Sequence, residues 1–151
     1  MERNGHIRIL LVEDHEAFRR HVSSMLREQA NLQVIGEVGD GPQAVRQAEA
    51  LQPDVILLDV GLPGINGLEA ARHIRDVARK ARIIFLTQES SPEVVQEAFD
   101  LGAWAYITKS QAGAELLPAV SAVSRGERFL NGNHKSQSTD RSVPARSIVS
   151  R

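Results

Sequence analysis

The chain has 151 residues, and 18 Lys and Arg against 19 Asp and Glu give a formal net charge of −1, which excludes a globally basic nucleic-acid binder and an acidic solvating tail. Cysteine is absent, which excludes disulfides, thiolate metal sites and cysteine nucleophiles and fits a reducing compartment. Neither a signal peptide nor an apolar run of the roughly 20 residues of a membrane span is visible. We therefore expect a cytoplasmic protein with one folded domain and no membrane contact.

Five short apolar runs rich in β-branched residues predict five β-strands. They are Ile9–Val12, Val34–Ile35, Val55–Leu58, Ile83–Leu86 and Ala105–Ile107. The first, third and fourth runs lack polar alternation, which is typical of strands buried on both faces of a parallel sheet.

A segment with helical apolar spacing follows each run, and the five apolar faces begin at Phe18, Ala44, Leu68, Val94 and Leu116. Pro42 and Pro92 stand where helices are expected to begin, and Gly102 where one is expected to end. Ser90 and Glu93 form a possible capping box, and Asn66 a possible N-cap. Strands and helices that alternate in this way predict a doubly wound α/β fold.

The character of the chain changes near its C-terminus. We expect residues 1–130 to form the folded domain. Residues 131–151 are rich in serine and have no helical or strand period, so we expect a flexible tail or a truncated linker there.

Polar side chains follow four of the apolar runs. They are Glu13 and Asp14 after the first, Asp59 after the third, Thr87 after the fourth and Lys109 after the fifth. The carboxyl ends of parallel strands share one edge of the sheet, where doubly wound folds bind ligands. Three carboxylates in a partly buried cleft repel one another, and Mg²⁺ relieves the repulsion. A carboxylate there can act as a nucleophile and become an acyl phosphate.

Four segments also resemble a known family. They are Val12-Glu13-Asp14-His15, the run from Pro53 to Gly67 that contains Asp59-x-x-Leu62-Pro63-x-x-Asn66-Gly67, Phe85-Leu86-Thr87, and the run from Gly102 to Lys109. Over about residues 7–130 the chain resembles the receiver domain of bacterial two-component response regulators. The segment from Arg125 to Leu130 is similar to the LuxR/FixJ-type subgroup, in which a DNA-binding domain follows. The resemblance implies a flavodoxin-like (βα)5 fold with strand order 2-1-3-4-5.

The resemblance also implies roles for single residues. Asp59 matches the phosphoacceptor. Glu13 and Asp14, with Asp59 and the backbone carbonyl of Gly61, match the Mg²⁺ ligands. Thr87 and Lys109 match the groups that contact the phosphoryl group, and Thr87 and Tyr106 match the switch. The implied donor is a sensor histidine kinase, a phosphotransfer protein or a small acyl phosphate. The implied domain is no enzyme in the usual sense, because it catalyses only its own phosphorylation and dephosphorylation.

The sequence supports other functions less well. A haloacid-dehalogenase-like phosphatase also uses a strand-end Asp with Mg²⁺, but it has a second Asp where this chain has Gly61. A degenerate receiver that only binds partners lacks the phosphoacceptor or its lysine, and Asp59 and Lys109 are both present. A single-domain receiver that acts in a phosphorelay or through protein contacts alone stays open.

The expected output surface is the face around the fourth helix, fifth strand and fifth helix, through which a homodimer is possible. No helix-turn-helix pattern follows Leu130, so we expect no DNA binding by this chain alone. Gln88 replaces the small residue usual in the family and is expected to crowd the phosphoryl group. His15 is expected to be exposed and Trp104 to be exposed or lightly packed. Pro118 is expected to disturb the fifth helix.

Overall fold

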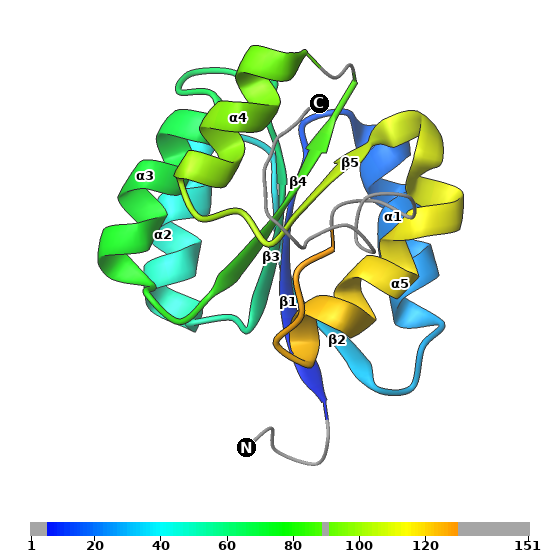
Figure 1. Cartoon of the computed structure of the whole chain (residues 1–151). Helices are drawn as coiled ribbons and strands as arrows, with labels where there is room; N and C mark the ends of the chain where they lie inside the picture. The colour runs from blue at the N-terminus through cyan, green and yellow to red at the C-terminus, as the bar shows by residue number, and fades with distance from the viewer. Residues whose placement is uncertain (1–5, 89–90, 130–151) are drawn as a thin grey trace.

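The computed structural model describes residues 6–88 and 91–129 of the chain. They form one five-stranded parallel sheet in the order β2-β1-β3-β4-β5, with a helix after every strand (Figure 1). The elements are β1 Ile7–Val12, α1 Glu16–Arg27, β2 Leu32–Val38, α2 Gly41–Leu51, β3 Val55–Asp59, α3 Gly67–Val77, β4 Arg82–Thr87, α4 Pro92–Asp100, β5 Ala105–Thr108, the short 3-10 helix η2 Lys109–Gln111 and α5 Ala112–Ser124. The predicted fold class and strand order are confirmed. The predicted tail at 131–151 lies outside the described residues.

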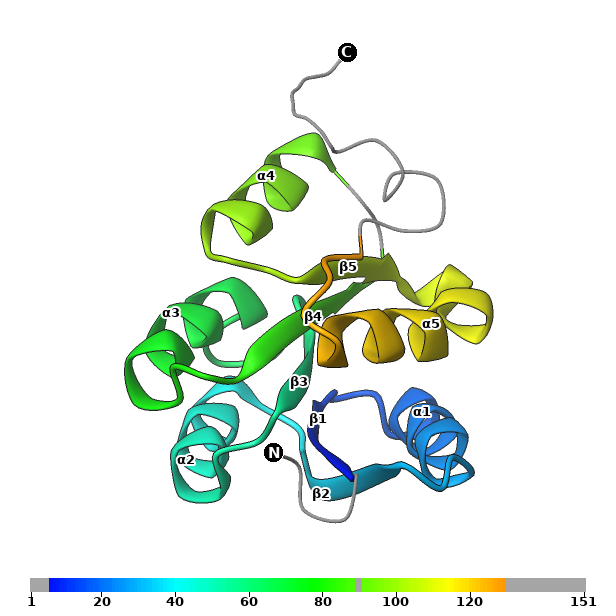
Figure 2. The same ribbon diagram turned by 60° about the horizontal axis from the view of Figure 1, so that its bottom comes forward.

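Two helical layers cover the sheet, with α1 and α5 on one face and α2, α3 and α4 on the other (Figure 2). Each layer has its own apolar core against the sheet. β3 runs through the middle of the molecule, and all five of its residues are buried. This position explains why the run from Val55 to Leu58 has no polar alternation. It also means that Asp59, the last residue of β3, emerges from the core rather than from the surface. None of the helices within 6–88 and 91–129 combines the length and the apolar character needed to cross a membrane.

The second strand is longer than its sequence pattern predicts. β2 covers Leu32–Val38, whereas the apolar run contains only Val34 and Ile35. β2 lies at the edge of the sheet and pairs only with β1, so Gln33 and Glu37 can be exposed within the strand. The pairing shifts register between Ile9 and Leu10 of β1. An edge strand of this kind gives a weak apolar signal.

Most of the predicted helix boundaries are confirmed, and one is wrong. Pro42 and Pro92 stand in the first turns of α2 and α4, and the Asn66 side chain accepts a hydrogen bond from the Glu69 amide at 2.9 Å. The cap of α4 is Ser91, whose hydroxyl accepts from the Val94 amide at 3.2 Å, and not Ser90, which lies outside the described residues. The predicted cap was one residue too early, and Val94, three residues after Ser91, cannot complete a capping box.

The end of α4 and the position of the proline in α5 also agree with the sequence predictions. Gly102 comes directly after the C-cap of α4 and has a φ of 91°, a left-handed conformation that favours glycine. Pro118 lies inside α5, as predicted. Nothing in the helix bounds indicates an interruption there.

Trp104 is half-buried, in line with a residue expected to be exposed or lightly packed. Its ring lies between two guanidinium groups, with Arg82 4.6 Å and Arg128 4.3 Å from the ring centroid. Its backbone oxygen accepts a hydrogen bond from the Phe129 amide at 2.8 Å, and Phe129 itself is buried. Stacked guanidinium groups are favourable neighbours of an indole ring. The chain after α5 is thereby fixed against the edge of β5.

Gly67, the first residue of α3, provides a test of the fold around β3. A Cβ atom at this position would lie 2.2 Å from the Asp59 carbonyl oxygen and 2.8 Å from the Val60 Cα, so backbone would have to move. We expect Gly67→Ala to lower the free energy of unfolding by about 3 kcal/mol. Urea denaturation followed by circular dichroism measures the change.

The matched control is Gly113→Ala in α5, where an added Cβ meets nothing within 4 Å. Alanine is the better helix former, so this variant should be at least as stable as the wild type. Equal stability of both variants would contradict the close contact between α3 and β3.

Candidate functional site

Three carboxylates from distant parts of the chain meet at the carboxyl edge of the sheet. Glu13 and Asp14 follow β1, and Asp59 ends β3. Glu13 is fully buried and Asp59 is 2% exposed, while Asp14 is half-buried. One donor atom from each of them, together with one from His15, fits within 4.8 Å of the others. The predicted convergence of strand ends therefore takes place, because parallel strands end on the same side.

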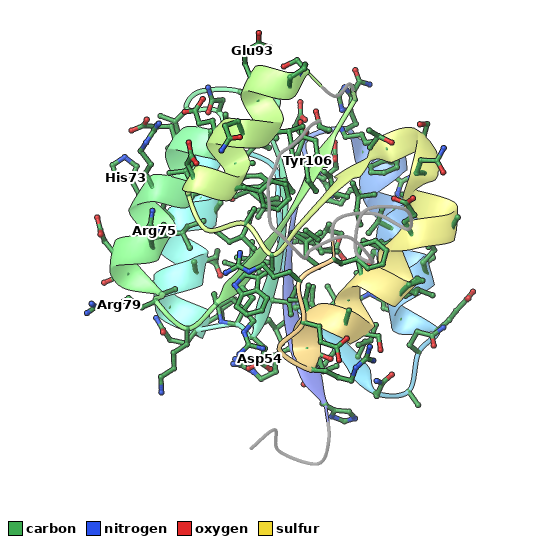
Figure 3. All side chains as sticks on the ribbon, in the orientation of Figure 1. Asp54, His73, Arg75, Arg79, Glu93 and Tyr106 are labelled. Atoms are coloured by element: carbon green, nitrogen blue, oxygen red, sulfur yellow. The ribbon has the colours of Figure 1, made fainter. Side chains whose placement is uncertain are left out.

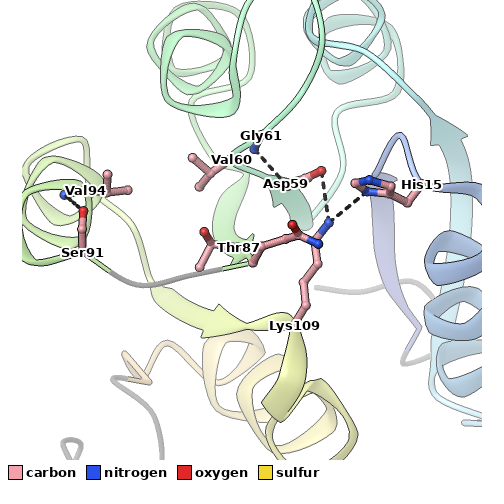
Figure 4. Close-up of a pocket in the computed structure, with 9 residues that line it drawn as sticks. His15, Asp59, Val60, Gly61, Thr87, Ser91, Val94 and Lys109 are labelled. Carbon is pink, nitrogen blue, oxygen red and sulfur yellow. Dashed lines mark hydrogen bonds and ion pairs between the residues drawn. The ribbon is translucent and has the colours of Figure 1, made fainter.

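Lys109 places its ammonium group among these carboxylates. It follows β5 directly, at the start of the 3-10 helix η2. Its Nζ donates to Glu13 Oε2 at 3.0 Å. It also donates to Asp59 Oδ2 at 3.4 Å, the contact drawn in Figure 4. The Phe18 ring of α1 lies below the ammonium group, with its centroid 5.1 Å from Nζ. Two carboxylates and an aromatic face thus hold one cation in place, which limits its freedom to leave the site.

One ammonium group does not balance the cluster. Glu13 Oε1 and Asp14 Oδ1 are buried, and within residues 6–88 and 91–129 no donor forms a hydrogen bond to either. Burial raises the pKa of Asp59 to about 6, and the charge of Glu13 adds to the rise, while the Gly61 amide and Lys109 oppose it. Buried carboxylate oxygens without donors are costly unless a cation faces them. The donor set, oxygen-rich and acidic, fits a hard divalent ion such as Mg²⁺.

Gly61 contributes its amide to the site. That N–H donates to Asp59 Oδ1 at 3.0 Å and so fixes the carboxylate from the side opposite Lys109. The resemblance assigned the Gly61 carbonyl to the metal, and this ligand stays a prediction.

A cavity of about 450 Å³ opens beside Asp59. It is lined by His15, Asp59, Val60, Gly61, Thr87, Gln88, Ser91, Val94 and Lys109, which come from the ends of β1, β3, β4 and β5 and from α4 (Figure 4). Gln88 is exposed and lines this cavity, and its crowding of the phosphoryl group stays a prediction. The cavity is large enough for a phosphoryl group and part of its donor.

Thr87 and Tyr106 connect this cavity to the core under α4. Both side chains are buried, with 6% and 7% exposed. Burial raises the pKa of the Tyr106 hydroxyl, and the neighbouring Thr87 side chain opposes that rise. The Tyr106 ring points inward below α4 and packs against Phe85, with 6.5 Å between ring centroids (Figure 3). A change at Thr87 therefore reaches Tyr106 through direct neighbours.

The sequence analysis missed the contributions of His15 and Phe18. His15 was expected to be a plain exposed residue, and its side chain is 57% exposed, yet its Nδ1 lies 3.1 Å from Glu13 Oε2. Its position directly after Asp14 was the available signal. Phe18 was assigned only to the apolar face of its helix, because no sequence pattern reports that Lys109 would lie over its ring.

The fold and the acidic cluster with its lysine define a class of protein. Residues 9–121 match the family model of the response regulator receiver domain. The match covers most of the chain, which therefore belongs to the response regulator receiver family.

The relatives found are bacterial response regulators. The chain is 39% identical over 124 residues to the transcriptional regulatory protein LiaR of Bacillus subtilis, a match that covers 82% of this chain and 59% of LiaR. It is 35% identical over 123 residues to the nitrate/nitrite response regulator NarL of Escherichia coli, covering 82% of this chain and 57% of NarL. The chain thus spans less than two thirds of the length of these curated relatives.

Solved structures agree with this placement. A LuxR-family two-component response regulator from Aurantimonas aligns with a TM-score of 0.80 and 34% identity, covering 85% of this chain and 91% of that chain. The response regulator domain of Thermotoga maritima CheB aligns with a TM-score of 0.74 and 30% identity, covering 80% and 97%.

The raised pKa of Asp59 predicts how its removal affects stability. In the unfolded chain this carboxyl has its ordinary pKa of 3.8, against about 6 in the folded protein. Folding therefore becomes less favourable as pH rises from about 4 through 6, because the buried group must ionise. In EDTA at pH 7.5, Asp59→Asn should be more stable than wild type by roughly 3 kcal/mol, and the gain should vanish near pH 4.

Urea denaturation across this pH range measures the difference. Asp76→Asn, an exposed change on α3, is the control and should show no gain at either pH. A gain at Asp59→Asn that does not depend on pH would contradict the assigned ionisation.

Proposed function

We propose that this chain is a signalling switch that accepts a phosphoryl group on Asp59 in a Mg²⁺-dependent reaction. The observation that carries the proposal is the juxtaposition at Asp59: a strand-end carboxylate, one cation from Lys109 at 3.4 Å, unpaired acidic oxygens beside it and an open cavity in front. Family membership supports the same role. The donor is a phosphohistidine on a sensor histidine kinase or phosphotransfer protein, or a small acyl phosphate.

The transfer moves one phosphoryl group between two nucleophiles. A carboxylate oxygen of Asp59 attacks phosphorus, the bond from phosphorus to the donor nitrogen or oxygen breaks, and the electron pair leaves with the donor. Lys109 then faces the new phosphoryl oxygens, and the Thr87 hydroxyl donates to one of them. In this scheme Asp59 is the residue that forms a covalent bond. The other residues position the reacting groups and supply positive charge. The chain is accordingly no enzyme toward other substrates.

Glu13, Asp14 and Asp59 would hold the Mg²⁺, together with the Gly61 carbonyl. When bound, the ion neutralises charge on the phosphoryl oxygens and on the acidic cluster. Its binding to the native state also stabilises the fold by mass action.

The output runs from Thr87 to Tyr106. When Thr87 turns toward the phosphoryl group, the space and the polar partner available to the Tyr106 hydroxyl change. Tyr106 packs in the core that also contacts Val94, Val95 and Phe99 of α4, so a new Tyr106 position alters the surface of α4 and β5. The proposed partners are a kinase or phosphotransfer protein at the cavity and a second copy of the chain at the face formed by α4, β5 and α5.

Phosphorylation at Asp59 is tested directly by mass. Incubated with acetyl phosphate and Mg²⁺, the wild type should gain one phosphoryl adduct that is lost at alkaline pH, as an acyl phosphate is. Asp59→Asn should gain none, and Asp54→Asn, a change at the opposite end of β3, should label like the wild type. Intact-mass spectrometry gives the result, and equal labelling of Asp59→Asn would refute the assignment.

The output face is tested by self-association. With beryllofluoride and Mg²⁺, the wild type should increase in mass by size-exclusion chromatography with light scattering, whereas Asp59→Asn should not respond. Fluorescence anisotropy with a random DNA duplex at physiological salt should show only weak, salt-sensitive binding. Tight DNA binding without any change in self-association would contradict an output through protein contacts.

The relatives are longer than this chain, and some are named transcriptional regulators. A role in transcription is therefore a proposal for the protein of which this domain is the receiver. A phosphorelay role without DNA is the alternative. The cytoplasmic location stays a prediction.

A further inference from the structure

The structure brings an imidazole to the acidic cluster. His15 Nδ1 lies 3.1 Å from Glu13 Oε2 and 3.5 Å from Asp14 Oδ1. Neighbouring ligands of an octahedral ion with metal–ligand distances of 2.0–2.1 Å lie about 3 Å apart. The 3.1 Å contact, which is also a hydrogen-bond distance, matches this spacing, whereas the Asp14 contact is longer, and the whole set with Asp59 lies within 4.8 Å. The Lys109 ammonium group lies 3.5 Å from the same ring nitrogen, so an ion on His15 would have to displace it.

Two buried oxygens of the cluster have no partner among the described residues, and one of them, Asp14 Oδ1, lies 3.5 Å from His15 Nδ1. Lys109 already contacts Glu13 Oε2 and Asp59 Oδ2. Glu13 Oε1 and Asp14 Oδ1 stay buried, without a hydrogen bond from any residue in 6–88 and 91–129. Glu13 is fully buried, so bulk solvent does not reach its carboxylate. A cation that faces Asp14 Oδ1 would have the His15 nitrogen beside it.

The backbone explains why this ring is available. His15 is the N-cap residue of α1, yet its side chain makes no capping hydrogen bond, in contrast to Asp40, Asn66 and Ser91 at the other helices. Its amide donates to Glu13 Oε2 at 3.0 Å, which anchors the residue at the cluster. A histidine at the N-cap position adds little to helix stability. Its ring lines the cavity instead.

We propose that His15 is a nitrogen ligand of the metal in this cluster, and that the site therefore takes borderline transition-metal ions such as Co²⁺, Ni²⁺ or Zn²⁺ in preference to Mg²⁺. Mg²⁺ selects oxygen donors, whereas an imidazole nitrogen suits the transition metals. The inference rests on the cation site of the proposed function and adds a fifth residue and a metal class to it. His15 supplies its nitrogen lone pair and takes no part in the phosphoryl transfer.

Co²⁺ and Mg²⁺ are the probes, titrated separately into the metal-free full chain. Binding is measured by calorimetry and by the rise in melting temperature, and for Co²⁺ also by its visible absorption. The wild type should bind Co²⁺ more tightly than Mg²⁺. His15→Ala should lower the Co²⁺ affinity by at least about tenfold, because removal of a residue that only hydrogen-bonds to a metal ligand already costs that much. The Mg²⁺ affinity should change by less than about twofold.

Two further variants serve as controls, one for helix stability and one for metal binding at another histidine. His15→Asn restores a good N-cap without a ring nitrogen, so it should fold well and still lose the Co²⁺ affinity. His73→Asn removes an exposed histidine that lies 3.2 Å from Glu69 on α3, a pair able to bind metal by chance, and should leave the Co²⁺ affinity of the cluster unchanged.

The outcomes separate the two proposals. Co²⁺ affinity that survives His15→Ala and His15→Asn while Mg²⁺ still binds would overturn the role of His15 and leave the phosphoacceptor site intact. Loss of Co²⁺ binding in His73→Asn instead would also overturn it. If neither ion binds the wild type, the cation site itself is refuted, together with the Mg²⁺ dependence proposed for Asp59.

Discussion

Glu13, Asp14 and Asp59 lie together at the end of the sheet, largely out of water, with Lys109 among them. Such a cluster is unfavourable by itself, because burial and mutual repulsion both oppose ionisation, and the raised pKa of Asp59 records this cost. Lys109 offsets part of it through two short contacts. Two buried oxygens are left without a donor among the described residues. The folded site therefore carries more negative than positive charge. A bound cation, or a phosphoryl group on Asp59, can change this difference.

The architecture keeps this cluster in position. β3 has helices on both faces, so its last residue is held by core packing on every side. Gly67 lets the start of α3 pass within van der Waals distance of the Asp59 backbone. The Gly61 amide fixes one carboxylate oxygen and Lys109 faces the other. The rigid sheet thus presents Asp59 in one orientation, while the loops and α4 around the cavity are the parts that can adjust.

The same strands connect the site to the end of the domain. Tyr106 of β5 lies under α4 (Figure 3). Trp104 precedes that strand, and the guanidinium groups of Arg82 and Arg128 lie over its ring. Phe129 bonds to the Trp104 backbone and bridges to Ala105. Neighbouring residues thus join the buried Tyr106 to the chain that follows α5. This continuity gives a physical basis for an output surface around α4, β5 and α5.

Much of this protein can be read from its sequence. Unbroken apolar runs such as Val55–Leu58 predict buried parallel strands, and the polar residues that follow them predict one shared edge, because the topology leaves no other place for strand ends. Local signals correctly predicted the helix ends at Pro42, Asn66 and Gly102, since caps and turns depend on a few neighbouring residues. Only the tertiary structure decided that Ser91 rather than Ser90 caps α4, that β2 extends through Gln33 and Glu37 at an exposed edge, and that Phe18, His15 and Trp104 contact charged groups far away in sequence. Those contacts join side chains from different elements, and their distances depend on how the helices pack on the sheet, which no local pattern records.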